Sequence, residues 1–526
     1  MFAPDVPGIP DVPGILRAAA KRFPGREAAV SGRDRVTYAA LHERAGRVAA
    51  GLHRLGPRTG SPVAVLADNS LAYLELYFAV PAAGMLLLPL NTRLAEPEIS
   101  AILTEAGTEL LLVGPGYEHI AAEVARSCPV RLIALPGTES GLSAITYERL
   151  LDRAPATPGQ AAEAAAADRG AYLYYTSGTS GRAKGVVLTH GNVLANALST
   201  AAAVGLTDQD VWLHAGPLFH LADAWAAWAV TWLGGRHVLE RFGPERTVAT
   251  ITRERVTRTL LVPTALDLLV EAAAAAGTRL PSLTGLLYGG APTSQRVFEK
   301  ARANIDAPLV HTYGATETAG TLTVLPAADH LDPDGNLRTG AVGRETPLAD
   351  IEVADSSGVP VGPGAIGQVT VRGPMVARGY LGQDERTREA FREGRYWTGD
   401  LGYRDEGGIL WLVGRQSDMI ITGGENVYAS EVERVLLRMD QIADAAVIGV
   451  PDAKWTERVT AFVVLTAGSR LTLAELRDFG RQHLGGYKLP RALHVVPELP
   501  RSGAGKVDRS ALRRIPARIT KEENGS

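Results

Sequence analysis

The sequence has little cysteine and no long uninterrupted hydrophobic run. Cys128 is the only cysteine among 526 residues, which excludes an internal disulfide and suits a reducing compartment. The most apolar segments, LYFAVPAAGMLLLPL and LADAWAAWAVTWLGG, are shorter than a bilayer span and are interrupted by Pro, Gly or Asp. The first residues lack the apolar core of a signal peptide. We therefore expect a cytoplasmic protein without an integral membrane segment.

An excess of charge of either sign is also missing. The chain has 54 Lys and Arg against 57 Asp and Glu, so its formal net charge is -3. This balance implies no strongly basic face and argues against nucleic acid as the main partner. The length exceeds what one hydrophobic core usually supports, so two or more domains are expected.

The first part of the chain alternates between helical patterns and short apolar runs. VAVLAD (63–68), LLLVG (110–114) and RLIAL (131–135) are typical of buried strands, and helical patterns lie before and after them. Strands that alternate with helices indicate an α/β fold with mostly parallel sheets. We predict a large domain of layered sheets and helices.

The residue pattern of the sequence changes from about residue 340. Short alternating runs divided by Gly and Pro predict a small antiparallel β unit there. An α+β pattern follows, with a helix at 430–438, strands at 445–451 and 459–465, and a helix at 472–484. We predict a large domain at 1–413, a connecting segment at 414–418 and a small α+β domain at 419–526.

The segment YYTSGTSGRAKG (174–185) has the composition of a phosphate-binding loop. It is not a Walker A loop, because Ala183 stands where the second glycine is required and Gly185 where the magnesium-binding hydroxyl is required. Its glycines, hydroxyls and Lys184 lie between a strand-like and a helix-like segment, where anions bind well. A flexible Ser/Gly linker has a similar composition, so this loop alone leaves the function open.

Four later segments decide between these interpretations. They are HTYGATET (311–318), YWTGDLGYRDEGG (396–408), LVGRQSDMIITGGENVYASEVE (412–433) and LPRSGAGKVDR (499–509). In this order and spacing the five segments resemble the adenylate-forming, AMP-binding superfamily of acyl-CoA synthetases, peptide-synthetase adenylation domains and luciferases. The resemblance extends from about residue 13 to 515. GGAP (289–292) and GVPDAKWTE (449–457) favour the acyl-CoA ligase branch.

The resemblance implies a two-step reaction. A carboxylic acid reacts with ATP to give acyl-AMP and pyrophosphate, and the thiol of CoA then displaces AMP. ATP and CoA are the expected co-substrates and Mg²⁺ the expected metal. The large domain would bind AMP and the acyl group, and the small domain would be a mobile lid.

The resemblance also implies a set of nucleotide contacts. Thr176, Ser177, Gly178, Thr179, Ser180, Gly181 and Lys184 would bind the β- and γ-phosphates, Thr316 the α-phosphate, Gly290, Ala291, Pro292 and Tyr313 the adenine, Asp400 the ribose, and Arg415 the ribose or a phosphate. Thr176 and Glu317 would hold Mg²⁺, which prefers oxygen ligands and takes few of them from protein. Glu317 and Thr316 are accordingly counted among the catalytic residues.

Lys506 is the expected catalytic lysine of the small domain. By resemblance it would contact the carboxylate and α-phosphate during adenylation and then withdraw when the domain rotates. Gly423, Gly424 and Glu425 would then form part of the CoA tunnel. The hinge departs from the family pattern, because Ser417 stands where this branch usually has Asp or Lys.

The resemblance places the acyl pocket around PLFH (217–220) and the helix that follows. His220 would lie beside the carboxylate and gate the thiol, and the other expected wall residues are Asp223, Ala224, Trp228, Tyr288, Gly289, His311 and Gly314. Two alternatives stay open. The stripe formed by Trp225, Trp228 and Trp232 is more typical of a core than of a substrate site, and Asp223 could belong to a buried network. The acid itself, aryl or aliphatic, is not determined.

Two other functions compete with an acyl-CoA ligase. The activated acid could pass to a carrier-protein thiol or to an amine. A degenerate nucleotide-binding regulator would lack Glu317 or Lys506, and both are present. The sequence does not distinguish a monomer from a homodimer.

Overall fold

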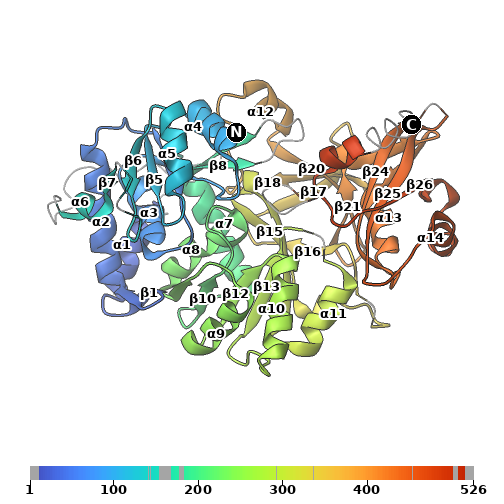
Figure 1. Ribbon diagram of the computed structural model, residues 1–526, viewed down its shortest axis with the longest axis horizontal. Helices are drawn as coiled ribbons and strands as arrows, with labels where there is room; N and C mark the ends of the chain where they lie inside the picture. The colour runs from blue at the N-terminus through green and yellow to red at the C-terminus, as the bar shows by residue number, and fades with distance from the viewer. Residues whose placement is uncertain are drawn as a thin grey trace.

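The computed structural model describes residues 11–139, 141–142, 144–152, 168–176, 183–291, 293–335, 337–452, 454–501 and 507–515. Within these ranges two large sheets and their helices form the body of the molecule. A smaller sheet forms a C-terminal lobe beside the body, at the right of Figure 1.

The first sheet is mostly parallel. Its strands, in spatial order, are β7 (Ile145–Thr146), β6 (Arg131–Ala134), β5 (Leu110–Val113), β3 (Pro62–Leu66), β4 (Leu86–Pro89), β8 (Gly170–Thr176) and β9 (Lys184–Thr189). Only β8 and β9 pair antiparallel in this order. The helices of this region are α1 (Val12–Arg22), α2 (Tyr38–Arg54), α3 (Leu71–Ala82), α4 (Glu96–Ala106), α5 (Glu118–Ser127) and α6 (Tyr147–Asp152). Strand β3 is buried along its whole length because helices cover both faces of the sheet.

The second sheet begins as a parallel sheet and continues as an antiparallel one. Its parallel part contains β14 (Leu309–Ala315), β13 (Gly285–Gly289), β12 (Arg258–Leu261), β10 (Val211–His214), β11 (Arg236–Leu239) and β1 (Glu27–Ser31), with β2 (Asp34–Thr37) at the edge. The helices of this part are α7 (His190–Val204), α8 (Leu221–Leu233), α9 (Pro244–Glu254), α10 (Pro263–Ala275) and α11 (Gln295–Asn304).

The antiparallel part matches the β unit expected after residue 340. It contains β15 (Gly320–Leu325), β16 (Ala341–Glu345), β17 (Asp350–Ala354), β18 (Gly367–Arg372), β19 (Phe391–Arg392), β20 (Arg395–Arg404) and β21 (Leu410–Arg415), with helix α12 (Asp384–Ala390). Short 3-10 turns η1 (Thr316–Thr318) and η2 (Ala327–Asp329) follow β14 and β15.

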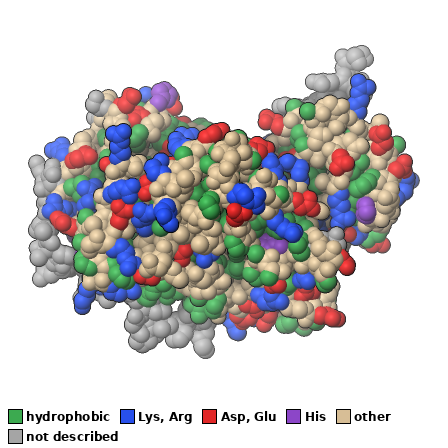
Figure 2. All heavy atoms as spheres, turned by 90° about the horizontal axis from the view of Figure 1, so that it is seen from below, with side chains coloured by type: hydrophobic (Ala, Val, Ile, Leu, Met, Phe, Trp, Pro, Cys, Tyr) green, Lys and Arg blue, Asp and Glu red, His purple; other side chains and the backbone are tan. Residues whose placement is uncertain are grey.

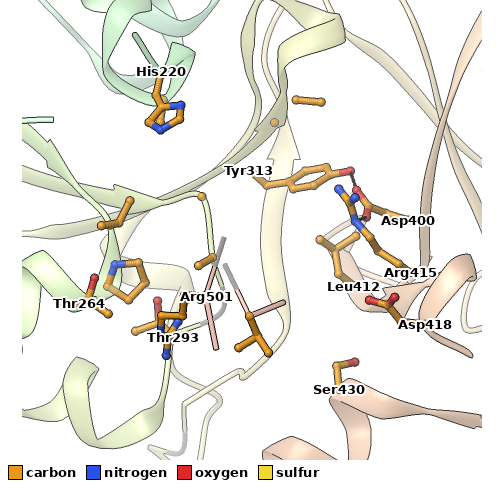
Figure 3. A pocket seen from close by; sticks show the side chains of 18 of the residues that line it. His220, Thr264, Thr293, Tyr313, Asp400, Leu412, Arg415, Asp418, Ser430 and Arg501 are labelled. Carbon is orange, nitrogen blue, oxygen red and sulfur yellow. Dashed lines mark hydrogen bonds and ion pairs between the residues drawn. The ribbon is translucent and has the colours of Figure 1, made fainter. Parts of the chain in front are cut away.

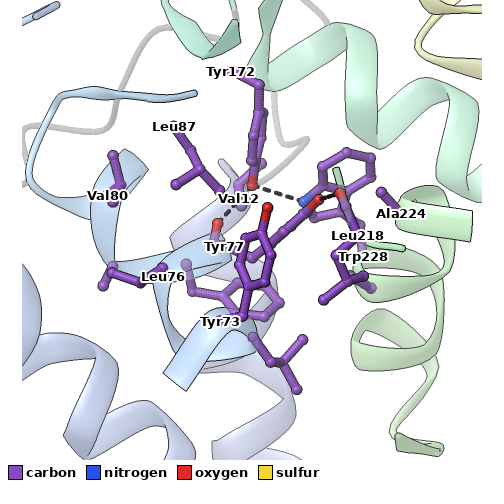
Figure 4. Close-up of a cluster of buried hydrophobic side chains, with 14 of the residues drawn as sticks. Val12, Tyr73, Leu76, Tyr77, Val80, Leu87, Tyr172, Leu218, Ala224 and Trp228 are labelled. Carbon is purple, nitrogen blue, oxygen red and sulfur yellow. Dashed lines mark hydrogen bonds between the residues drawn. The ribbon is translucent and has the colours of Figure 1, made fainter. Parts of the chain in front are cut away.

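One core joins the two large sheets. Side chains of α1, α2, α3, α7 and α8 pack between one face of each sheet, and Tyr77, Tyr172 and Trp228 are fully buried there. In Figure 4 the hydroxyl of Tyr172 accepts a hydrogen bond from Trp228 Nε1 (2.8 Å) and donates one to the carbonyl of Tyr77 (2.6 Å). These bonds satisfy the polar tips of the aromatic side chains, so large rings are buried at low cost.

The C-terminal lobe has a hydrophobic core of its own. Turn η3 (Gln416–Asp418) leads into β22 (Met419–Thr422), β23 (Glu425–Tyr428), α13 (Ala429–Leu436), β24 (Ile442–Asp452), β25 (Thr456–Leu465), α14 (Leu473–Gly480), η4 (Gly486–Lys488) and β26 (Ala492–Val495). The strands lie in the order β23-β22-β25-β24, with β26 beside β25.

The predicted α/β class, with a large N-terminal part and a small α+β C-terminal part, is confirmed. The exact boundaries at 413 and 419 stay a prediction. No helix in the described part of the chain is both long and apolar enough to cross a bilayer.

Candidate active site

A cleft of about 4520 Å³ runs between the body and the C-terminal lobe. Figure 2 shows it as the notch that separates the two parts. The predicted site residues on its wall are Thr176, Lys184, His220, Asp223, Tyr288, Gly290, Ala291, His311, Tyr313, Gly314, Thr316, Glu317, Asp400, Arg415 and Ser417. Segments from very different parts of the sequence therefore meet at one surface.

Several predicted residues lie elsewhere or are not described. Ala224 and Trp228 are fully buried in the core rather than on the cleft wall, because the face of α8 that carries them packs against β8 and α3. Gly289 packs closely against the neighbouring strand, because a Cβ atom at this position would lie 2.2 Å from the carbonyl oxygen of Thr312. The expected tunnel residues Gly423, Gly424 and Glu425, at a hairpin tip, are not part of this wall. The predictions for Ser177, Gly178, Thr179, Ser180, Gly181, Pro292 and Lys506 fall outside the described residues.

A carboxylate with two fixed donors marks one side of the cleft (Figure 3). Asp400 accepts hydrogen bonds from the hydroxyl of Tyr313 (2.7 Å) and from Nε of Arg415 (3.0 Å). Asp400 and Arg415 are directly opposite each other on β20 and β21, so the sheet register brings them together. The nearby Asp400 charge raises the pKa of Arg415. The arrangement holds the Asp400 carboxylate in one orientation, with acceptor capacity left for a ligand.

Close backbone packing shapes the end of β14. A Cβ atom on Gly314 would lie 1.9 Å from the carbonyl oxygen of Gly320, so only glycine fits there. The pairing with β15 shifts register at this point, and the chain then turns through η1. Thr316 and Glu317 therefore project into the cleft from a turn rather than from a strand.

Tyr380 connects the two groups expected to handle phosphate and metal. Its hydroxyl donates a hydrogen bond to Oε1 of Glu317 (2.9 Å), and Nζ of Lys184 lies 4.8 Å from its ring centroid. Burial lowers the pKa of Lys184, while the charge of Glu317 acts in the opposite direction. Sequence reasoning missed Tyr380, since an aromatic residue in VARGYLG carries no signal of its partners.

Thr176 and Glu317, the two expected Mg²⁺ ligands, both line the cleft and both carry side-chain oxygen atoms. Thr176 lies opposite Lys184 in the β8–β9 pair, at the mouth of the phosphate-type loop. No cluster of three or more His, Cys, Asp or Glu side chains in the described ranges could hold a metal ion. Mg²⁺ does not require one, because it usually binds one or two protein oxygens together with water and substrate phosphates.

The acyl side of the cleft is formed by the start of α8 and by β13 and β14. His220 is the N-cap residue of α8 and packs edge-on against Phe219, with ring centroids 4.7 Å apart. Figure 3 shows its imidazole on the wall across the cleft from Tyr313. This position is compatible with the predicted contact with a carboxylate.

A buried chain of hydrogen bonds fixes this start of α8. The Asp223 carboxylate lies 3.0 Å from Nε1 of Trp212 and 2.8 Å from Nδ1 of His214. The other ring nitrogen of His214, Nε2, lies 3.0 Å from Nδ1 of His237. Nε2 of His237 in turn lies 3.0 Å from the hydroxyl of Thr231. Burial, and then the adjacent His214, lower the pKa of His237. The Asp223 carboxylate lies within hydrogen-bonding distance of two buried ring nitrogens, those of Trp212 and His214. Of the two roles considered for Asp223, the geometry favours the buried network.

The C-terminal lobe reaches the cleft through an arginine near the end of the described chain. Arg509 forms ion pairs with Asp418 (3.2 Å) and Glu433 (2.7 Å). Asp418 belongs to η3, next to the predicted hinge residue Ser417. Arg509 lies three residues after Lys506, so these bonds anchor the chain beyond that lysine to the connection between body and lobe.

The fold and the cleft define a class of enzyme. One cleft brings together an oriented carboxylate, a lysine and a second carboxylate linked through Tyr380, and a histidine at the start of α8. This is the arrangement of an ATP-dependent ligase that activates carboxylic acids.

Comparisons with known proteins agree with that class. A family model for AMP-binding enzymes matches residues 16–381, and one for the C-terminal domain of AMP-binding enzymes matches residues 431–506. A feruloyl-CoA synthase from Amycolatopsis sp is 36% identical over 499 residues, covering 94% of this chain and 97% of that protein. A fatty acid–[acyl-carrier-protein] ligase from Streptomyces coeruleorubidus is 32% identical over 488 residues, covering 91% of each.

Solved structures give the same result. An amide bond synthetase from Marinactinospora thermotolerans has a TM-score of 0.86 and 31% identity, covering 96% of this chain and 99% of that one. The o-succinylbenzoate CoA synthetase from Bacillus subtilis, solved with ATP and magnesium ion, has a TM-score of 0.81 and 30% identity, covering 95% and 99%.

The chain belongs to the AMP-binding enzyme family. The predicted class, an AMP-forming acid–thiol ligase that uses ATP with Mg²⁺, is confirmed.

Proposed function

We propose that this chain is an acyl-CoA ligase that converts a carboxylic acid and ATP to acyl-AMP and pyrophosphate, and then transfers the acyl group to CoA with release of AMP. One observation carries the proposal. The short segment from Tyr313 to Glu317 connects the Asp400–Arg415 pair, which suits a ribose, to the Lys184–Tyr380 pair, which suits phosphates.

The first half-reaction brings an anionic nucleophile to a polyanion, so charge stabilisation and alignment must supply most of the catalysis. Asp400 and Arg415 hold the ribose, and Tyr313 packs against adenine. Lys184 offsets charge on the phosphates that leave, and Thr316 contacts the one that stays. Mg²⁺ held by Thr176 and Glu317 would neutralise phosphate charge.

The second half-reaction requires the adenylation lysine to withdraw. We propose that residues 419–526 rotate about 414–418 and carry Lys506 away from the acyl-adenylate, so that a thiol can approach past His220. The predicted tunnel residues Gly423 and Glu425, which lie off the cleft wall in this orientation, would reach it only after such a rotation. Serine at 417 tolerates the torsion change that this requires.

The acid is proposed to be compact and largely apolar. The aromatic side chains of Phe219 and Tyr288 line the cleft on the acyl side and are largely buried. Similarity to a feruloyl-CoA synthase supports an aryl acid, and similarity to a fatty acid–carrier-protein ligase keeps aliphatic acids and a carrier-protein acceptor as the alternative. Similarity to an amide bond synthetase supports an amine as a further alternative acceptor of the acyl group. Cytoplasmic location and oligomeric state stay predictions.

The test combines an acid panel with an acceptor panel. Aryl, short, medium and long acids are incubated with ATP and Mg²⁺, and pyrophosphate release is followed with CoA, with a phosphopantetheinylated carrier protein or with an amine. We expect release that depends on acid and a thioester that forms with CoA. Lys506→Ala should lower acid-dependent pyrophosphate exchange by about 10²- to 10³-fold. An unchanged rate of pyrophosphate exchange in this variant would contradict the proposed role of Lys506.

A further inference from the structure

His311 lies on the acyl wall with hydrogen-bonding capacity that the protein does not use. It belongs to β14, lines the cleft and is half-buried. Its Nδ1 atom is buried and has no partner among the described residues. Burial lowers the pKa of His311 to about 3, so the ring is neutral at ordinary pH and carries one N–H.

The hydroxyl of the neighbouring Tyr288 already uses its proton in a hydrogen bond within the protein. Its ring packs edge-on against His311, with centroids 5.0 Å apart. Its hydroxyl lies 2.8 Å from Nε2 of His330, whose Nδ1 lies 2.9 Å from the carbonyl of Pro326. Because a carbonyl only accepts, Nδ1 of His330 carries the proton, and Nε2 of the neutral ring accepts from Tyr288. The hydroxyl proton of Tyr288 is therefore committed to the protein.

A similar argument shows which ring nitrogen of His311 carries the proton. A buried N–H without a partner is rarer and more costly than a buried lone pair without one. Nδ1 of His311 therefore carries the lone pair and Nε2 carries the proton. Since Nδ1 is enclosed by protein, the exposed edge of the ring presents the Nε2–H group to the cleft. A neutral donor thus faces the side of the cleft assigned to the acyl group.

We propose that His311 is a specificity-determining residue that donates a hydrogen bond from Nε2–H to an uncharged acceptor oxygen on the acyl group. The preferred acid then carries an ether, methoxy or carbonyl oxygen in addition to the carboxylate that reacts. This inference rests on the proposed function and adds a chemical feature of its substrate. An acid without that oxygen displaces water from the N–H group without replacing its hydrogen bond, and sites built to hydrogen-bond a substrate discriminate strongly against an analogue that lacks the partner.

The test uses pairs of acids of the same shape that differ by one oxygen. The pairs are 4-methoxybenzoate and 4-ethylbenzoate, 4-methoxycinnamate and 4-ethylcinnamate, 3-phenoxypropanoate and 4-phenylbutanoate, and 6-methoxyhexanoate and octanoate. The kcat/KM for pyrophosphate release is measured for each acid. In at least one pair we expect the native enzyme to prefer the oxygen-containing acid by about 10- to 100-fold.

Variants separate hydrogen bonding from packing. His311→Leu should bring the ratio within the pair close to one, mainly by lowering kcat/KM for the oxygen-containing acid. His311→Gln keeps an N–H donor and should keep most of the preference. His119→Leu, at an exposed histidine outside the cleft, is the control and should leave the ratio unchanged. If His311→Leu does not fold, His311→Phe takes its place against His311→Gln.

Two outcomes overturn the inference. One is a native enzyme that turns over both members of every pair within about threefold of each other. The other is a preference that survives in His311→Leu or His311→Phe. Failure of the proposed function is distinct from both, because no acid would then cause ATP-dependent pyrophosphate release.

Discussion

Replacing Tyr380 by phenylalanine tests whether this residue positions the proposed magnesium ligand. The substitution removes one hydroxyl, which lies 2.9 Å from Oε1 of Glu317, and keeps the ring that lies 4.8 Å from Nζ of Lys184. Tyr380 is 6% exposed and packs against Phe391 with ring centroids 5.5 Å apart, so the ring should stay in place. The perturbation is thus confined to the hydroxyl, which contacts Glu317 and also Tyr396.

The size of the effect follows from the hydrogen bond to Glu317. A hydrogen bond to a charged group contributes about 1.5–3 kcal/mol, which corresponds to about 10- to 150-fold in an equilibrium. Partners that orient a metal ligand affect metal affinity by about 10- to 100-fold. We therefore expect Tyr380→Phe to raise the Mg²⁺ concentration for half-maximal pyrophosphate release by about 10- to 100-fold.

The assay is a Mg²⁺ titration of acid-dependent pyrophosphate release at saturating ATP. The rate at high Mg²⁺ should approach that of the native enzyme, and thioester formation from preformed acyl-AMP should be unaffected. Tyr380→Leu, which also removes the ring beside Lys184, should be slower at every Mg²⁺ concentration. An unchanged Mg²⁺ dependence in Tyr380→Phe would refute the argument.

Three further predictions address the phosphate loop, the backbone and the pH dependence of stability. Lys184→Ala should slow adenylation by about 10²- to 10³-fold and leave thioester formation from preformed acyl-AMP nearly unchanged; equal losses in both steps would contradict the assignment of this loop. Gly314→Ala should lower the free energy of unfolding in urea by at least 1–3 kcal/mol, on the order expected for overpacking, whereas Gly46→Ala, with open space around its Cβ position, should not. Burial lowers the pKa of His190 from 6.5 to about 4, so the unfolded chain binds more protons between these values, and the stability present above pH 6.5 is lost as the pH falls. Between pH 7 and pH 5 the free energy of unfolding in urea should fall by about 2 kcal/mol more in the native protein than in His190→Gln, by the linkage relation. His119→Gln, at an exposed histidine, is the control. An equal pH dependence in the native protein and His190→Gln would disprove the argument.

The periodicity of the sequence predicted much of the layered part of the fold. The expected strands at 63–68, 110–114 and 131–135 correspond to β3, β5 and β6. They were recognisable because a parallel strand buried on both faces is a continuous apolar run. The β22–β23 hairpin was not predicted, because its strands are short, half-exposed and joined by two glycines at positive φ.

Motif order predicted which residues share the cleft, but not how they contact one another. Thr176, Glu317, Asp400 and Arg415 were named from their segments, and all four line the cleft. The hydroxyl of Tyr380 meets Glu317 63 residues away, and only the folded chain brings the two together.

The His214–His237 pair was not predicted for the same reason. Its two residues lie on adjacent parallel strands, β10 and β11, whose register is set by the sheet and not by local sequence. Of the two roles left open for Trp228, the structure favours the core, because Trp225 and Trp228 are both fully buried.

The most direct test of the account is a product balance for one full turnover. With ATP, Mg²⁺, CoA and an accepted acid, the products are separated and quantified by chromatography and phosphorus NMR. The account predicts AMP, pyrophosphate and acyl-CoA in equal amounts, and acyl-AMP with pyrophosphate when CoA is omitted. Formation of ADP and phosphate, or of AMP without any CoA thioester, would contradict it.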